Sequence, residues 1–299
     1  MHFAKYHGTG NDFVMVEDLA DELHLDRTAI AALCDRRFGV GADGLIRVVR
    51  GDGGQGGVSG ADFFMDYYNA DGAVAEMCGN GIRCLAKLVF DRGLTKSREL
   101  RVATRAGLKH LVLHVDGSVV RRVTVDMGPP SLERKSIGMS GEPTDTFVGL
   151  PLEVAERTFT ATAVSMGNPH CVLFLAPTDD LVGIDVPRLG SIVENMTELF
   201  TNRTNVEFVK PVGPVLETRV WERGSGETFA CGTGACAALV AASVAGLVGR
   251  EAQVRFPGGT LDLVWSYDDH VLMTGPAIRV YEGETEDDWL ASVSTREPR

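Results

Sequence analysis

Hydrophobic and polar residues alternate along many short stretches of this chain, which is the pattern of half-buried β-strands. In the first half the stretches lie at residues 1–16, where a glycine turn separates two strands, and at 45–49, 63–68, 100–104, 108–115 and 119–127. In the second half they lie at 158–164, 171–175, 205–210, 216–221, 252–256, 260–264 and 271–274. The pattern therefore predicts two similar sets of short strands.

Three segments have a helical pattern instead. Residues 81–92 and 233–248 are apolar on nearly every face, so each predicts a helix that is surrounded by other elements. A third helix is expected to begin at Asp26 or Thr28 and to end at Arg37. Because strands and helices do not alternate regularly, the sequence predicts an α+β fold, with short, mainly antiparallel strands wrapped around one central apolar helix in each half.

An internal repeat supports the division into halves. Residues 69–81 and 222–234 both end in Cys-Gly-x-Gly, and a shift of 153 positions superimposes Cys78 on Cys231. A weaker match relates Gly10-Asn11 to Gly167-Asn168. Together with the Gly128-Pro129-Pro130 break, the repeat predicts two domains, one of residues 1–127 plus 277–299 and the other of residues 128–276, with the active site in the cleft between them.

Composition and charge exclude several classes of function. A net charge of −12 over 299 residues argues against nucleic-acid binding, which needs a basic surface. The six cysteines do not form the framework of a small disulfide-rich protein, and their spacing does not match a zinc site, so no metal is expected. The N-terminus lacks the pattern of a signal peptide and no apolar run is long enough to span a membrane, so we expect a cytoplasmic protein without a membrane partner.

Two segments are expected to be loops or tails. Residues 51–60 hold six glycines, and no helix pattern follows them, so we interpret them as a flexible hairpin loop and not as a phosphate site. Residues 280–299 are expected to end in an acidic, mobile tail.

The repeated cysteines suggest the chemistry. In both copies a glycine-rich loop delivers a cysteine to the start of a helix, where unpaired N–H groups and the helix dipole favour the thiolate. Two such groups suggest a pair that acts on opposite faces of one carbon, one sulfur removing a proton and the other supplying one. The same N–H groups, at Gly79–Gly81 and Gly232–Gly234, are expected to stabilise the charge that develops on the substrate.

These motifs resemble those of the diaminopimelate epimerase family. The resemblance rests on the two cysteine loops, on Gly8-Thr9-Gly10-Asn11-Asp12-Phe13 and on Gly167-Asn168-Pro169-His170, and it extends from about residue 3 to residue 281. It implies a homodimeric enzyme that interconverts LL- and meso-diaminopimelate without a cofactor, in the biosynthesis of lysine and peptidoglycan precursors. It also implies that, from LL to meso, Cys231 is the proton acceptor and Cys78 the proton donor.

The resemblance assigns further residues to the site. It implies that His170 and Glu222 tune the cysteines. It implies that the substrate is bound by Asn11, Asn69, Gly79, Asn80, Asn168, Asn205, Glu222, Arg223, Gly232 and Thr233. An arginine suits the distal carboxylate of the substrate, and carboxylate or amide oxygens suit its ammonium group. One departure is Gly44, which stands where some family members have a glutamine that contributes to the site.

Other functions remain open from the residues alone. A proline or hydroxyproline racemase uses a similar thiol pair, but its first motif resembles Met-Cys-Gly-His-Gly, and Asn80 replaces that histidine here. A thiol redox or metal-binding protein and a duplicated, non-catalytic binding protein are further alternatives. The remaining cysteines lack the flanking loop and are assigned to packing; they are Cys34, Cys84, Cys171 and Cys236.

Overall fold

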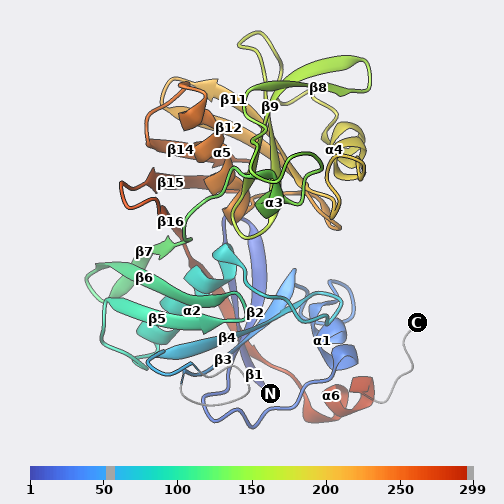
Figure 1. Ribbon diagram of the computed structural model, residues 1–299. Coiled ribbons are helices and arrows are strands. Elements are labelled where there is room, and N and C mark those ends of the chain that lie inside the picture. Colours follow the sequence, from blue (N-terminus) through green and yellow to red (C-terminus); the bar gives the residue numbers. More distant parts are fainter. Residues whose placement is uncertain (52–57, 295–299) are drawn as a thin grey trace. The chain divides into compact units, whose positions relative to one another are not determined.

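The computed structural model describes residues 1–51 and 58–294, and the chain forms two compact units (Figure 1). Unit 1 is Met1–Val125 with Gly275–Arg299, and unit 2 is Asp126–Thr274. Both junctions lie two residues from the boundaries expected from the sequence. Most of the glycine-rich segment, residues 52–57, lies outside the described residues, as does the end of the chain at 295–299.

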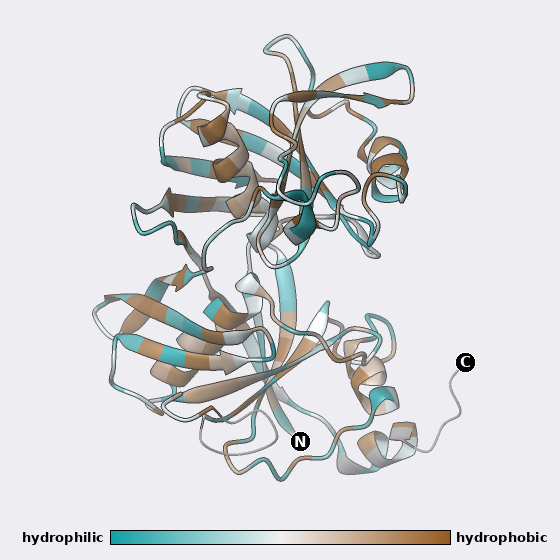
Figure 2. Ribbon diagram, in the orientation of Figure 1, coloured by the Kyte–Doolittle hydropathy of each residue, from teal (hydrophilic) through white to brown (hydrophobic). Residues whose placement is uncertain are grey.

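Unit 1 contains a sheet of eight strands. In spatial order these are β17 (Ile278–Glu284), β1 (His2–Gly8), β2 (Asn11–Glu17), β3 (Gly44–Arg50), β4 (Phe63–Asn69), β5 (Glu99–Thr104), β6 (Gly107–Asp116) and β7 (Val119–Asp126). The pairs β2–β3 and β4–β5 are parallel, and the other pairs are antiparallel. Along β5 and β6 hydrophilic and hydrophobic residues alternate (Figure 2), as expected for strands with one buried face.

Unit 2 repeats this plan. Its main strands, in spatial order, are β8 (Leu150–Val154), β9 (Arg157–Ser165), β10 (Pro169–Phe174), β11 (Asn205–Val212), β12 (Val215–Glu222), β14 (Glu251–Phe256), β15 (Gly259–Trp265) and β16 (Val271–Pro276). Again the third and fifth pairs, β10–β11 and β12–β14, are parallel. A short strand, β13 (Gly226–Thr228), also pairs with β12. The identical order of parallel and antiparallel pairs confirms the duplication predicted from the sequence.

One buried helix lies at the centre of each unit. Helix α2 (Gly79–Asp91) contacts β1, β2, β3, β6 and β17, and α5 (Gly232–Val244) contacts strands β9 to β12, β14 and β15. Helix α5 is almost entirely apolar, as the sequence predicts. Helix α2 also buries Arg83 and Lys87, which donate to the carbonyl groups of Gly79 and Val120. These bonds satisfy cations that would otherwise be costly to bury.

The smaller helices cover one face of each sheet. Helix α1 (Arg27–Cys34) is capped by Asp26, whose carboxylate accepts from the N–H of Ala29, and it packs on the core of unit 1. In unit 2 the corresponding place is taken by α4 (Val186–Glu194), capped by Asp185. A single helical turn, α3 (Arg134–Ile137), contacts β9 and β10. Within the described residues, no helix is long and apolar enough to cross a membrane.

The prediction for residues 280–299 was wrong over most of its length. Residues 278–284 form β17, which pairs with β1, and α6 (Asp287–Ser294) packs Trp289 and Leu290 on the core beside α1. Strand β17 exposes residues of both faces, including Ile278, Val280 and Tyr281, so its sequence lacks a clear alternation. The helix α4 and the strand β8 were not predicted either.

Candidate active site

Cys78 and Cys231 hold the same position in the two units, immediately before the central helix. Cys78 precedes α2 with φ −137° and ψ 120°, and Cys231 precedes α5 with φ −122° and ψ 122°. Both cysteines are extended, so the first-turn N–H groups that follow have no partner within the helix. The structure confirms the sequence prediction that each cysteine lies at a helix start.

The third residue of each helix is a glycine, and a side chain from the neighbouring strand fills the space beside it. A Cβ at Gly81 would lie 2.6 Å from Ile46 Cδ1 on β3, and a Cβ at Gly234 would lie 2.6 Å from Glu207 Oε1 on β11. Ile46 and Glu207 occupy equivalent places in the two sheets. The plan shared by the two units therefore places an apolar contact in unit 1 and a buried carboxylate in unit 2.

In unit 1 the thiol of Cys78 faces a hydrogen-bond acceptor. Its Sγ lies 3.4 Å from Asn11 Oδ1, and Asn80 Nδ2 donates to the same oxygen over 3.3 Å. An amide oxygen has no proton to give, so the Cys78 thiol is the donor in this contact. The geometry is that of a group held ready to donate a proton.

Asp43, which the sequence analysis did not single out, orients Asn11. Its carboxylate accepts from Asn11 Nδ2 at 2.8 Å and from the guanidinium of Arg36 at 2.7 Å. Because a carboxylate only accepts, Asn11 must turn its nitrogen to Asp43 and its oxygen to Cys78. Asn80 is fixed in the same way, since its Oδ1 accepts from the buried Arg83 at 2.9 Å.

Asn69 and Gly44 lie on neighbouring strands of unit 1. Asn69 is the exposed last residue of β4, and its backbone N–H donates to Ala73 O. A Cβ at Gly44 would lie 2.5 Å from Tyr68 O and 2.7 Å from the ring of Tyr67. A side chain at position 44, such as a glutamine, would therefore require the neighbouring β4 backbone to move.

In unit 2 a chain of hydrogen bonds runs from the half-buried helix start to the buried strand β11. Asn168 Nδ2 donates to Thr233 Oγ1 over 3.3 Å, and Asn168 Oδ1 is 3.0 Å from His170 Nε2. His170 Nδ1 is 2.7 Å from Glu207 Oε1, and both of these side chains are fully buried. The sequence analysis missed Glu207. A charged residue at an inward position of the apolar strand β11 was the available signal.

Asn205 supports the backbone of the site. Its Oδ1 accepts from the N–H of Arg223, and its Nδ2 donates to Pro169 O, both over 2.9 Å. The guanidinium of Arg223 donates to Asn202 O over 2.9 Å, and the residue itself is exposed. Asn205 thus joins the two loops of unit 2 that carry Arg223 and Asn168.

Glu222 lies beside Cys231 and affects its ionisation. The carboxylate of Glu222 accepts from Thr228 Oγ1 at 2.5 Å and from the Cys231 thiol. Burial raises the pKa of Cys231 well above its usual value, and the carboxylates of Glu222 and Glu207 raise it further; Thr233 and the N–H of Gly234 act in the opposite direction. Burial also raises the pKa of Glu222. Glu222 is therefore placed to take the proton from Cys231.

This result corrects one prediction. The helix start was expected to favour the thiolate of Cys231, but burial and the two neighbouring carboxylates outweigh the N–H groups in the ligand-free protein. Removing a thiolate from water is costly, and a nearby anion adds to that cost.

Replacing Glu222 by glutamine should lower the pKa of Cys231. The amide keeps the size of the side chain but removes the negative charge that opposes ionisation. The measurement is the pH dependence of Cys231 alkylation by iodoacetamide, made in a Cys78→Ala background. Glu227→Gln, at the exposed middle residue of strand β13, is the matched control. An alkylation profile that stays in place or moves to higher pH in Glu222→Gln would refute this electrostatic account.

The other cysteines are buried in the two cores. Burial raises the pKa of both Cys34 and Cys84 to about 12, and it raises that of Cys171 as well. Such thiols remain protonated near neutral pH and suit packing. Among residues 1–51 and 58–294, no group of three or more His, Cys, Asp or Glu side chains is arranged to hold a metal ion.

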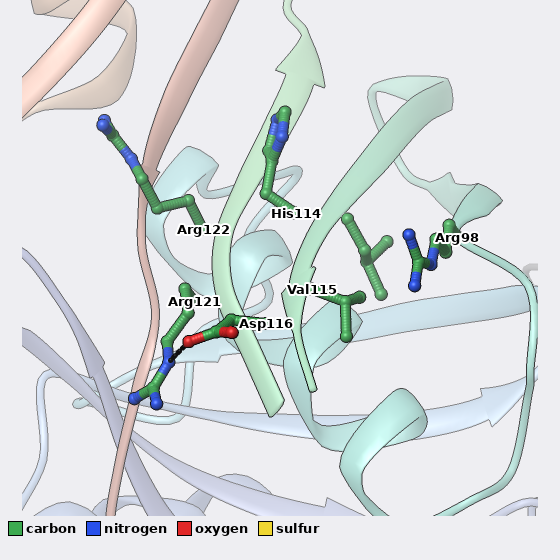
Figure 3. Close-up of a pocket in the computed structure, with 7 residues that line it drawn as sticks. Arg98, His114, Val115, Asp116, Arg121 and Arg122 are labelled. Atoms are coloured by element: carbon green, nitrogen blue, oxygen red, sulfur yellow. Dashed lines mark ion pairs between the residues drawn. The ribbon is translucent and has the colours of Figure 1, made fainter. Parts of the chain in front are cut away.

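A pocket of about 340 Å³ lies on the β6–β7 hairpin of unit 1 (Figure 3). Its lining residues are Arg98, Leu113, His114, Val115, Asp116, Arg121 and Arg122. Arg121 and Asp116 form an ion pair over 3.6 Å. None of the predicted site residues lines this pocket, so it is separate from the two cysteine sites.

Comparison with solved structures supports the fold. A PhzF-family phenazine biosynthesis protein from Bacillus anthracis is similar with a TM-score of 0.66 and 17% identity, covering 96% of this chain and 99% of that one. A hydroxyproline epimerase from Agrobacterium vitis is similar with a TM-score of 0.63 and 16% identity, covering 99% and 98%. At these identities the similarity establishes the two-unit α+β fold alone.

Comparison with known sequences identifies the family, which the structural similarity alone does not. The chain is 46% identical to the diaminopimelate epimerase of Moorella thermoacetica over 287 residues, which cover 95% of this chain and 99% of that protein. It is 45% identical to the diaminopimelate epimerase of Synechococcus elongatus over 289 residues, covering 96% and 98%. The family model for diaminopimelate epimerase matches residues 3–133 and 162–280. The chain therefore belongs to the diaminopimelate epimerase family.

Proposed function

We propose that this protein interconverts LL- and meso-diaminopimelate by proton transfer at the α-carbon, with Cys78 and Cys231 as the two acid-base groups. The observation that carries the proposal is the placement of the two cysteines at equivalent helix starts, in a chain that matches the family over nearly its full length. The reaction requires both sulfurs to reach one carbon from opposite faces. We therefore place the active site in the cleft between the two halves.

The contacts of the two cysteines support different roles. From LL to meso, Glu222 takes the proton of Cys231, and the resulting thiolate removes the α-proton of the substrate. The thiol of Cys78, held by Asn11 Oδ1, gives its proton to the opposite face. The substrate thus gains one proton for the one it loses. After the step Cys231 is again a thiol, Cys78 is a thiolate and Glu222 is protonated, so the net transfer of one proton from Glu222 to Cys78 through solvent restores the starting state.

The negative charge that develops on the substrate needs stabilisation without a cofactor. The N–H groups of Gly79, Asn80 and Gly81, and of Gly232, Thr233 and Gly234, lie in the first turns of α2 and α5. Such groups, with the positive end of the helix dipole, stabilise an anion without having to reorganise during the reaction. We assign them to the α-carboxylate.

The distal end of the substrate is assigned to the remaining polar residues. Arg223 is proposed to bind the distal carboxylate, with Glu222, Asn69 and Asn168 contributing to the ammonium and carboxylate groups. Asn205 contributes by fixing the backbone of Arg223. His170 is proposed to tune the site of Cys231 through its hydrogen bonds with Asn168 and Glu207.

Incubation with LL-diaminopimelate under reducing conditions tests the activity. Chiral chromatography should detect meso-diaminopimelate, and parallel incubations with L-proline and trans-4-hydroxy-L-proline should give no product. Conversion of either proline substrate, with diaminopimelate untouched, would replace this proposal by a proline-type racemase.

We further propose that the enzyme is a cytoplasmic homodimer that serves lysine and peptidoglycan precursor biosynthesis. These features follow from the family resemblance. The exposed apolar side chains of β17 offer a surface for a second copy, with Ile278 46%, Val280 56% and Tyr281 45% exposed. Light scattering should give twice the chain mass of 32.1 kDa. A monomeric mass at micromolar concentration would contradict the dimer.

A further inference from the structure

Glu194 is a buried carboxylate to which neither the sequence motifs nor the proposed mechanism assigns a role. It is the last residue of α4 and only 4% exposed. A buried charge is costly unless hydrogen-bond donors surround it. The donors around Glu194 therefore indicate what it holds in place.

Three donors from two segments of the chain meet this carboxylate. Trp221 Nε1, at the end of β12, donates to Oε2 over 2.7 Å. The backbone N–H of Gly224 donates to Oε1 over 2.9 Å, and Arg203 donates to the same oxygen over 3.0 Å. Glu194 thus ties the end of α4 to the loop before β11 and to the turn after β12.

The packing of α4 brings Glu194 to this place. A Cβ at Gly190 would lie 2.5 Å from Trp221 Cβ, so the helix contacts β12 closely at that point. Residues four apart lie on the same face of a helix. Glu194, one turn beyond Gly190, therefore reaches the end of β12 and the turn that follows it.

Both segments held by Glu194 have backbone conformations that need support. Arg203 has φ 58°, in the left-handed region that is unfavourable for a residue with a side chain, and Gly224 has φ 78°. The ion pair with Glu194 compensates for the conformation of Arg203, and the hydrogen bond fixes the N–H of Gly224.

These two segments also make the contacts of Arg223. Its guanidinium donates to Asn202 O, next to Arg203 in the chain, and its backbone is followed directly by Gly224. We propose that Glu194 is the positioning residue for Arg223, which it aligns to bind the distal carboxylate of the substrate. The inference rests on the proposed function, because it assigns Arg223 to that carboxylate.

Glu194→Gln tests the inference. The glutamine keeps the size of the side chain but replaces one acceptor oxygen with a donor group, so it cannot accept from both Trp221 and Gly224 as the carboxylate does. We expect KM for LL-diaminopimelate to rise about tenfold or more, and kcat to change less than about threefold, because the loss affects substrate binding and not proton transfer. Glu198→Gln, four residues away and exposed, makes the same chemical change and should leave both constants unaltered.

A double-mutant cycle with Arg223→Ala separates positioning from general destabilisation. If Glu194 acts through Arg223, Glu194→Gln will raise KM by less than about twofold once Arg223 is absent, because the two effects are not additive. An equal rise of KM in both backgrounds, or no rise in the wild-type background, would overturn the inference.

Folding and activity are checked in the same experiment. Circular dichroism establishes that each variant is folded. If Glu194→Gln does not fold, Glu194→Asp serves instead, since it keeps the charge but shortens the side chain, and it should show the same rise in KM. Wild type without epimerase activity would refute the proposed function, whereas active wild type with an unchanged KM in the folded variant would refute the role of Glu194 alone.

Discussion

Cys78→Ala and Cys231→Ala should each lower the rate of diaminopimelate epimerisation by about 10³- to 10⁴-fold. Acid-base catalysis by one positioned group commonly contributes about 10²- to 10⁴-fold, and here inversion needs both groups in every turnover. Losing either sulfur leaves one face of the α-carbon without its proton donor or acceptor. The measurement is kcat for both directions, with LL- and meso-diaminopimelate as substrates.

The chain provides a matched control for these variants. Cys84→Ala and Cys236→Ala make the same substitution about one and a half turns further along the same helices, where both thiols are buried. They are expected to lower stability slightly through the lost volume, and to leave kcat within about threefold of wild type. Retention of epimerase activity by folded Cys78→Ala or Cys231→Ala would exclude the two-base mechanism.

Arg223→Ala should raise KM for diaminopimelate by about 10- to 100-fold. The charged contact between the guanidinium and the distal carboxylate is lost in this variant, and a hydrogen bond to a charged group contributes about 1.5–3 kcal/mol, which is roughly 10- to 150-fold in binding. Because Arg223 is exposed, the fold should tolerate the change, and the thermal midpoint is expected to remain within a few degrees of wild type. Steady-state kinetics and thermal unfolding measure the two quantities.

Arg255→Ala is the control for charge. Arg255 lies on β14 in the same unit and makes a surface ion pair with Glu217, so its removal changes the net charge equally but should leave KM unaltered. Arg223→Lys keeps the charge but loses the paired donors, and should give an intermediate KM. An unchanged KM in Arg223→Ala would remove Arg223 from the distal site.

The parts of the fold that the sequence predicted are those with a buried face. Strands such as β5 and β6 alternate because one side packs inward, and the two central helices are apolar because strands surround them. Strand β17 gave no such signal, since it exposes residues on both faces and is defined by its pairing with β1. Helix α4, which was not predicted, does have a local signal in the sequence, because Asp185 can cap the helix and Pro187 suits its first turn.

In the candidate site, the sequence motifs identified residues in or next to the repeated cysteine loops. They did not identify the residues from other elements that form hydrogen bonds with them. Asp43, Glu194 and Glu207 reach Asn11, Gly224 and His170 from other elements. Such tertiary partners leave no spacing pattern in a single sequence. The pKa of Cys231 was mispredicted for a related reason, because burial and the approach of Glu207 depend on tertiary structure.

The most direct test of the central claim is proton exchange at the α-carbon. LL-diaminopimelate is incubated in D₂O under reducing conditions with wild type, Cys78→Ala or Cys231→Ala, and α-deuterium is followed by NMR or mass spectrometry together with the stereochemistry. The account predicts that wild type incorporates solvent deuterium with inversion and that neither variant inverts the centre. No exchange by folded, fully reduced wild type would contradict it.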